Sequence, residues 1–334
     1  MKKRNIIPKL AAAAMMLCAA FLLPAQDERY SQIPKGAALI VTLNLGKLYS
    51  SPTFKAAAES GDILAIRNDL KQIPWNAAET VPDPVIVYAP RMGSSYAMLV
   101  RTDKTPQQLV SDVNARFGNK KTVESGKTGG ADTITVKYPK TDRKTKKQTM
   151  KTEAEILYLT PGTTAFGRKG RPLDFAFFAD DKLPASEFAF LQNAPADAVA
   201  VGVMRSFPIP AADDPTGLSA LVKSGDFVIA EYKPGAASLL LNLECKGEKE
   251  AQMAARRLKS FIQLTLVSLF SADPSLFKEL NKSYTATSSG CRTKLEIELS
   301  KSTLDRIRAF YLAEQAILST ADAAIDIATE VLKK

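Results

Sequence analysis

Histidine is absent from this chain of 334 residues, and tryptophan occurs only once. Because histidine is the side chain that titrates near neutral pH, its absence excludes Ser-His-Asp and Cys-His catalytic sets and a histidine-based pH switch. It also excludes nearly all ligand arrangements of catalytic zinc. Several large classes of enzyme are therefore ruled out before any fold is considered.

Long apolar runs are scarce, and the one that stands out lies at the N-terminus. Residues 10–23 are apolar and uncharged, and they follow four basic residues: Lys2, Lys3, Arg4 and Lys9. A bilayer span needs about 20 helical residues, so this shorter run is typical of a bacterial secretory signal. We predict a signal peptide over 1–25, an exported protein that is periplasmic or extracellular, and no transmembrane span in the mature chain. An uncleaved signal that serves as an N-terminal membrane anchor is the alternative.

Acidic residues are fewer than basic ones, but the excess of basic residues is concentrated in a few segments of the chain. The formal net charge is +10, and removal of the predicted signal leaves +6. The stretch KYPKTDRKTKKQTMK, residues 137–151, holds seven basic side chains and one acidic side chain, which accounts for this whole remainder. The rest of the mature chain is close to neutral, so the charge indicates one basic segment and not a basic binding face.

The basic segment lies between two predicted strands, 133–138 and 154–159. It has no apolar periodicity, which excludes an amphipathic membrane helix, and export argues against a nucleic acid as the target. We predict a long hairpin extension with a solvated tip. The sharper hypothesis is contact with an anionic envelope surface, made by six side chains: Lys140, Arg143, Lys144, Lys146, Lys147 and Lys151.

Two parts of the chain repeat the same order of elements. Each begins with a buried strand, continues with a hairpin, then a helix with apolar residues at helical spacing, and then a further strand. This order is the split β-α-β plan of ferredoxin-like domains. The matched elements are strands 33–44 and 194–205, hairpins 84–101 and 226–244, and helices 105–117 and 248–270.

The predicted fold class is α+β, with two tandem ferredoxin-like domains that have antiparallel sheets. The first domain covers 26–193 and carries the basic hairpin, and the second covers 194–334. A long C-terminal helix that begins near Ser302 has an apolar stripe. We expect this stripe to pack across the two domains; the alternative is that its end docks a partner or a second copy.

Cysteine is also scarce. Cys18 lies in the predicted signal, which leaves Cys245 and Cys291. An oxidising compartment favours a disulfide between such a pair, and strand alternation places both at core-facing positions. In the ferredoxin-like order, however, they would lie at opposite ends of the sheet, beyond the roughly 7 Å Cα separation that a bridge tolerates. We therefore expect two buried free thiols.

Two motif-like stretches lack the necessary context. The segment 126–130 reads GKTGG, but a phosphate-binding loop requires an earlier glycine where Lys121 stands, and a strand follows instead of a helix. Ser275 and Lys278 form an S-x-x-K, and 127–129 reads KTG, yet penicillin-binding enzymes carry these elements in the opposite order. Paired acidic residues lie in turns or at a helix start, where their roles are structural. No catalytic residue, cofactor or metal site is predicted.

These observations favour a non-enzymatic protein that binds or scaffolds in the cell envelope, with an envelope protein or an anionic envelope surface as its partner. Two alternatives stay open. A modulator of another exported protein, as an inhibitor or chaperone-like subunit, would expose an apolar patch or a free sheet edge. A hydrolase that uses carboxylates, or a metal held by oxygen ligands, would gather acidic residues in a deep pocket between the domains.

Overall fold

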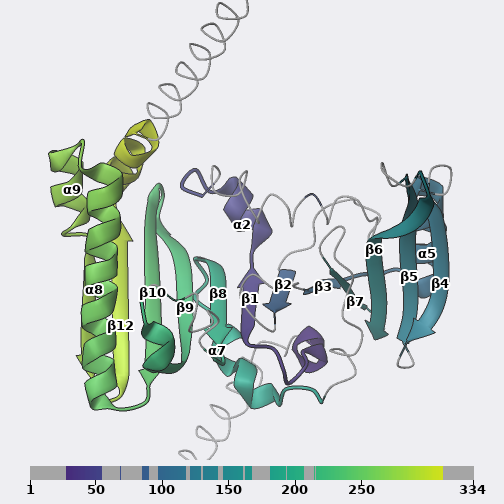
Figure 1. Ribbon diagram of the computed structural model, residues 1–334, viewed down its shortest axis with the longest axis horizontal. Coiled ribbons are helices and arrows are strands. Elements are labelled where there is room, and N and C mark those ends of the chain that lie inside the picture. The colour runs from purple at the N-terminus through teal and green to yellow at the C-terminus, as the bar shows by residue number, and fades with distance from the viewer. Residues whose placement is uncertain are drawn as a thin grey trace, which may run out of the picture.

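One large antiparallel sheet of 12 strands runs through the computed structural model, and a small number of helices lie on its faces (Figure 1). The fold is therefore mixed α+β. The predicted signal peptide and everything beyond residue 310 lie outside the described residues. The structure describes residues 28–54, 68, 85–89, 97–117, 121–128, 131–141, 146–160, 162–167, 181–192, 194–206, 214 and 216–310.

The strands of the first part of the chain are β1 Leu39–Leu43, β2 Val85–Ala89, β3 Ala97–Arg101, β4 Thr122–Thr128, β5 Ala131–Thr141, β6 Gln148–Thr160 and β7 Thr163–Gly167. Those of the second part are β8 Ala198–Met204, β9 Val222–Lys233, β10 Ala236–Cys245, β11 Tyr284–Ser289 and β12 Arg292–Leu299. Across the sheet they follow the order β11-β12-β10-β9-β8-β1-β2-β3-β7-β6-β5-β4.

The described α-helices are α2 Leu45–Ser50, α5 Pro106–Phe117, α7 Ala189–Gln192, α8 Glu248–Phe270 and α9 Pro274–Leu280. Three short 3-10 helices accompany them: η1 Glu28–Gln32, η2 Ala185–Phe188 and η4 Leu218–Ala220. Residues 301–310 are also helical. Among these described helices, none has the length and apolar character that crossing a membrane requires.

The sheet consists of two halves that repeat one plan. Each half has a single strand (β1 or β8), a hairpin (β2–β3 or β9–β10), a helix (α5 or α8) and an outer strand pair (β4–β5 or β11–β12). The first half has two more strands, β6 and β7, between its hairpin and its outer pair. The halves join where β1 pairs with β8, from Leu39 opposite Met204 to Leu43 opposite Ala200.

The strand order corrects the predicted ferredoxin-like arrangement. In that arrangement, the last strand of each half would lie beside its first strand. Here β12 lies between β10 and β11, while β8 lies between β1 and β9. Because β8 is buried along almost its whole length, its backbone N–H and C=O groups need partners on both edges, and β1 of the first half supplies one of these partner strands. The two predicted domains therefore share one continuous sheet.

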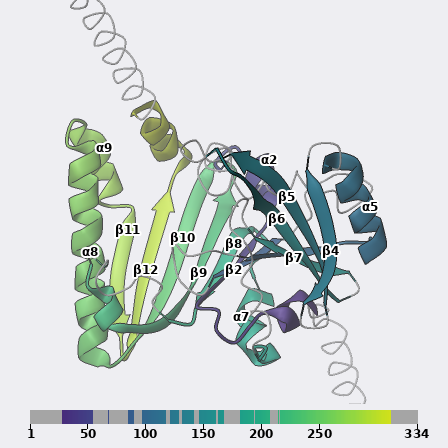
Figure 2. The ribbon, with the colours of Figure 1, turned by 45° about the vertical axis from the view of Figure 1, so that its right-hand side comes forward.

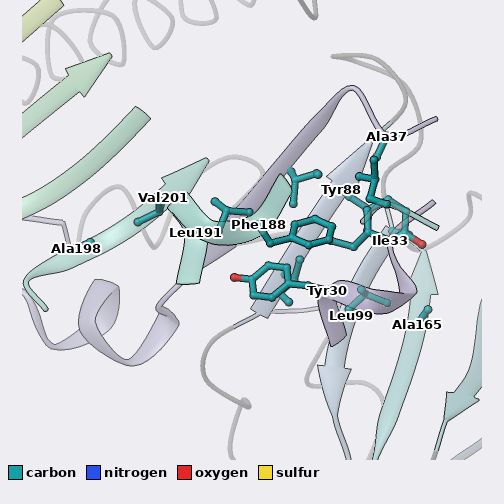
Figure 3. Packing of buried hydrophobic residues seen from close by; sticks show 14 of the residues in the cluster. Tyr30, Ile33, Ala37, Tyr88, Leu99, Ala165, Phe188, Leu191, Ala198 and Val201 are labelled. Atoms are coloured by element: carbon teal, nitrogen blue, oxygen red, sulfur yellow. The ribbon is translucent and has the colours of Figure 1, made fainter. Parts of the chain in front are cut away.

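Side chains of alternate residues divide the centre of the sheet into two cores. Ile86 and Tyr88 belong to one apolar cluster, and their neighbours Val85 and Val87 belong to the other. The first cluster is covered by η1 and η2, from which the rings of Tyr30 and Phe188 stack 5.1 Å apart (Figure 3). The second is covered by α2 and α5, through side chains that include Leu45, Leu48, Leu109 and Val113.

Helix α8 lies on one face of the outer strands of the second half (Figure 2). Its residues match the predicted helix 248–270. Two acidic side chains, Glu248 and Glu250, lie in its first turn, where they complement the helix dipole. Ala254 and Leu258 pack against Leu295 of β12 in a third apolar cluster. The sheet therefore buries one side of α8 and leaves the opposite side to solvent.

Candidate functional site

The candidate basic side chains lie at one end of the β5–β6 hairpin. The ladder between these strands continues to the pair Thr141↔Gln148, at the end of the hairpin where Lys146 and Lys147 lie. Arg143 and Lys144 lie outside the described residues. The hairpin thus brings like charges together on a solvated projection, where their mutual repulsion makes an anionic partner favourable. Four candidates are described, and all are exposed: Lys140, Lys146, Lys147 and Lys151.

The outer side of α8 carries an exposed apolar stripe that the sequence did not predict. The stripe follows the helix for four turns, and Leu264 at its centre is 70% exposed. In the described part of the chain outside α8, only Met150 and Tyr232 are large hydrophobic side chains of comparable exposure. The stripe, called the α8 face below, consists of Met253 (39% exposed), Phe261 (43%), Leu264 (70%) and Val267 (49%).

Phe261 and Leu269 are among the apolar residues whose helical spacing predicts this helix, and both are exposed. Residues 261–270 read FIQLTLVSLF, which is apolar around the whole circumference of the helix and contains no charge. A sheet can bury only one side of such a helix. That uncharged run is the signal from which an exposed stripe could have been predicted.

Basic side chains lie beside the α8 face. Arg256, Arg257 and Lys259 are all exposed on the preceding turns of the helix. Arg257 is held in place because its Nη1 donates to the carbonyl oxygen of Gly217 at 2.6 Å. The candidate surface thus has an apolar centre and a positively charged margin.

A cavity of about 730 Å³ opens on the sheet face that α8 does not cover. Strand alternation brings Asp226 of β9 and Glu244 of β10 into its wall, with Arg292 of β12 beside them. Arg205 also lines it, but its guanidinium is engaged: Nε lies 3.4 Å from Glu187, and Nη1 donates to the carbonyl oxygens of Lys35 and Ala37. The cavity is therefore a mixed-charge surface, and part of its charge is already paired within the protein.

Asp226 is the half-buried acid of this cavity. Burial raises the pKa of its carboxyl above the ordinary value, and the Asn242 side chain and the charge of Arg292 oppose that shift only in part. Asn242 Nδ2 donates to Asp226 Oδ1 at 2.6 Å. The two residues lie directly opposite each other in the β9–β10 ladder. This contact orients the carboxyl but supplies no nucleophile or base beside it.

A second cavity, of about 460 Å³, lies between α5 and the strands β4, β5 and β6. Val110, Ile134 and Ile156 form its apolar part, and Lys127 and Asp132 lie 3.8 Å apart in its polar part. Gly126, in the rejected phosphate-loop motif, is in the middle of strand β4. The described residues of that motif therefore have no helix N-terminus to hold a phosphate.

The described residues offer no metal site, because no group of three or more acidic or cysteine side chains is close enough to hold an ion. Ser275 of the S-x-x-K motif lies at the start of α9. Its Oγ accepts a hydrogen bond from Arg306 Nη2 at 3.3 Å, which is a structural contact.

The cysteines lie differently from the prediction. Both are free thiols, but Cys291 is exposed and only Cys245 is buried. They are also neighbours, because the backbone N–H of Cys245 donates to the carbonyl oxygen of Cys291 at 2.8 Å. The predicted separation was wrong because it depended on the ferredoxin-like order, whereas β10 and β12 pair directly. The alternation that placed Leu243 and Cys245 on one core-facing side is confirmed.

No protein family and no curated protein matches this chain. Among solved structures, crystal forms I and IV of TP0453 are similar to it, each at 9% sequence identity. Form IV aligns with 85% of this chain and 99% of its own at a TM-score of 0.38, and form I with 86% and 99% at 0.39. A likeness this distant carries no conclusion about function.

Proposed function

We propose that this chain is a non-enzymatic, exported protein of the cell envelope that binds a second envelope protein through the α8 face. The observation that carries the proposal is the concentration of four exposed apolar side chains on one side of one helix. Contiguous exposed apolar patches on soluble proteins mark interaction surfaces more often than scattered exposed residues do. The predicted signal peptide is the basis for placing the interaction in the envelope.

The size of the side chains supports a protein partner. Burial of one Leu, Val, Phe or Met side chain contributes about 1.5–3 kcal/mol, and a small number of residues carries most of the binding energy of an interface. Leu264 and Phe261 would contribute the most binding free energy on burial, because both side chains are bulky and exposed. The basic margin formed by Arg256 and Lys259 favours a partner whose rim is acidic, since complementary rims set orientation and association rate.

Substitution at the centre of the face tests the proposal. Leu264→Lys places a charge in the stripe and should reduce recovery of the partner from native envelopes at least tenfold, measured by quantitative mass spectrometry after affinity purification. Tyr232→Lys is the matched control, because Tyr232 is 37% exposed on β9, outside both the α8 face and the basic hairpin. Both variants should keep the wild-type melting temperature, since neither side chain is in a core. Equal protein recovery by wild type and Leu264→Lys would refute the proposal.

Contact of the hairpin tip with an anionic surface is the second candidate function. It is supported by the exposure of Lys140, Lys146 and Lys147 at the hairpin end. Replacing these three by Gln should leave the melting temperature unchanged and abolish binding to phosphatidylglycerol vesicles at low salt. Binding by wild type should weaken as salt rises, because exposed charges are screened. If the triple variant binds the vesicles as well as wild type does, the tip has no such role.

A further inference from the structure

Cys245 and Cys291 occupy directly opposite positions in two neighbouring strands. The β10–β12 ladder pairs Leu243 with Thr293 and Glu244 with Arg292. The next pair in this register is Cys245 and Cys291, and the 2.8 Å hydrogen bond from the Cys245 N–H to the Cys291 carbonyl oxygen shows that the register continues. The two cysteines are 46 positions apart in the sequence, and they lie opposite each other at the end of the β10–β12 ladder.

General ladder spacing places the two cysteines within the Cα range of a disulfide. Opposite residues that share a backbone hydrogen bond in an antiparallel pair have Cα atoms about 5.5 Å apart. Disulfides span Cα separations of about 4.4–6.8 Å. Opposite residues also direct their side chains to the same face of a sheet. Cys291 lies in the two-residue turn between β11 and β12, where Gly290 has the left-handed φ of 53°.

We propose that Cys245 and Cys291 are a redox pair that forms a disulfide in an oxidising compartment. The oxidant is a disulfide of low molecular weight or of an oxidoreductase, written RSSR. The Cys291 thiolate attacks one sulfur of RSSR, which forms a mixed disulfide and releases RS⁻. The Cys245 thiolate then attacks the Cys291 sulfur and releases the second RS⁻. Two thiols are oxidised, one RSSR is reduced to two RSH, and no other reactant is needed.

Exposure assigns the order of the two attacks. Cys291 is exposed and can meet the oxidant, whereas Cys245 is buried. Burial raises the pKa of the Cys245 thiol, and the contact of its Sγ with Thr293 Oγ1 at 3.7 Å opposes this only in part. Cys245 is therefore a poor first nucleophile and is suited to the second, intramolecular step, in which proximity compensates for its small thiolate fraction.

The bond would enclose the segment that carries α8, α9 and β11. Helix α8 begins at Glu248, directly after the β10 end that the bond would fix. A cross-link across a loop of this length stabilises chiefly by restricting the unfolded chain. The bond would therefore anchor the base of α8 to the sheet. The disulfide stands on the β10–β12 pairing and is independent of binding at the α8 face.

The test uses the full chain with Cys18→Ser, so that two thiols remain. After reduction and then treatment with glutathione disulfide, we expect a mass about 2 Da below that of the reduced chain, no thiol that reacts with maleimide in denaturant, and a Cys245–Cys291 cross-linked peptide. The melting temperature should rise by about 5–10 °C on oxidation.

Cys291→Ser is the control variant because its side chain is exposed, so folding should be preserved. It should show neither the mass change nor the oxidation-dependent rise in melting temperature, and Cys245 in it should react slowly with maleimide in the folded state. Recovery of two free thiols from the oxidised Cys18→Ser chain would overturn the proposal. So would stable glutathione adducts or linkage between chains in place of the internal bond.

Discussion

Val41 of β1 lies directly opposite Gly202 of β8, at the middle of the ladder that joins the two halves of the sheet. On its other edge β8 pairs with β9, where Gly202 faces Phe227. A Cβ atom on Gly202 would lie 2.2 Å from both Cε1 and Cζ of the Phe227 ring. The ring therefore occupies the space that the side chain of any other residue at 202 would fill.

Gly202→Ala should destabilise the protein, because the Phe227 ring must leave its position over β8. Overpacking of this kind costs about 1–3 kcal/mol, which urea denaturation with one global transition would measure. Phe227→Leu removes the ring and should reduce the cost of Gly202→Ala in a double-mutant cycle. Additive effects of the two substitutions, or a Gly202→Ala variant as stable as wild type, would contradict this account.

Asp214 should contribute to stability in a pH-dependent way. Partial burial raises the pKa of its carboxyl, but hydrogen bonds from the Ser219 and Thr216 backbone N–H groups and the side-chain hydroxyls outweigh that effect and lower it from 3.8 to about 2. A depressed folded-state pKa gives stability that is present above the unfolded value and is lost as pH falls through the folded value. The relevant window is therefore from about pH 4 down to about pH 2.

Asp214→Ala should reduce the free energy of unfolding by about 1–2 kcal/mol at pH 7. The difference from wild type should close as pH falls toward 2, followed by denaturant titrations at several pH values. The Thr216 N–H donates to Asp214 Oδ1 at 2.9 Å. Asp214→Asn keeps an acceptor oxygen for this N–H, so it should lose less stability than Asp214→Ala. A difference that is the same at pH 7 and pH 2 would assign the effect to packing and not to charge.

Asp226 should behave in the opposite way. Burial raises the folded-state pKa of its carboxyl, so ionisation opposes folding. The free energy of unfolding therefore decreases as pH rises through the interval between the ordinary and the raised pKa. Asp226→Asn keeps an oxygen to accept from Asn242 and removes the charge. We expect this variant to melt at a higher temperature than wild type at pH 7 and at nearly the same temperature at pH 3. A lower melting temperature at pH 7 would show that attraction to Arg292 outweighs burial.

Arg306 should fix the helical residues 301–310 to α9. Its Nη1 donates to Glu279 at 2.7 Å and its Nη2 to Asp273 at 3.1 Å. Arg306→Ala should increase hydrogen exchange of the 301–310 amides several-fold while exchange in α8 stays unchanged. Arg306→Lys should restore only part of the protection, because one ammonium group cannot bridge two carboxylates in the manner of a guanidinium. Full protection in the alanine variant would show that apolar packing alone holds this segment.

Helix α8 shows how much of the fold the sequence predicts. Its bounds follow from continuous apolar spacing and acidic residues in the first turn, and the structure has the same bounds, Glu248–Phe270. Its exposed side was not predicted, because Phe261 and Leu264 are equally apolar and only one side of the helix faces the sheet. Local spacing identifies a helix, but which of its sides is buried depends on the strands beneath it.

The hairpins show the same limit. Val85–Ala89 with Ala97–Arg101, and Val222–Lys233 with Ala236–Cys245, pair as their turns and alternation predict. The pairings of β1 with β8 and of β10 with β12 join residues far apart in the chain, and no turn encodes them. The placement of the last strand of each half beside its first strand was therefore an assumption. The predicted separation of the two cysteines depended on that placement and was wrong.

The sequence by itself determined the kinds of element, their approximate limits, the position of the basic hairpin and the absence of histidine chemistry. These properties follow from side-chain spacing and composition, which act over a few residues. Only the tertiary structure decided which strands are neighbours, and hence that Cys245 faces Cys291 and that Leu264 is exposed. The reason is that strand order depends on free-energy differences between whole arrangements of the sheet, in which every local element stays the same.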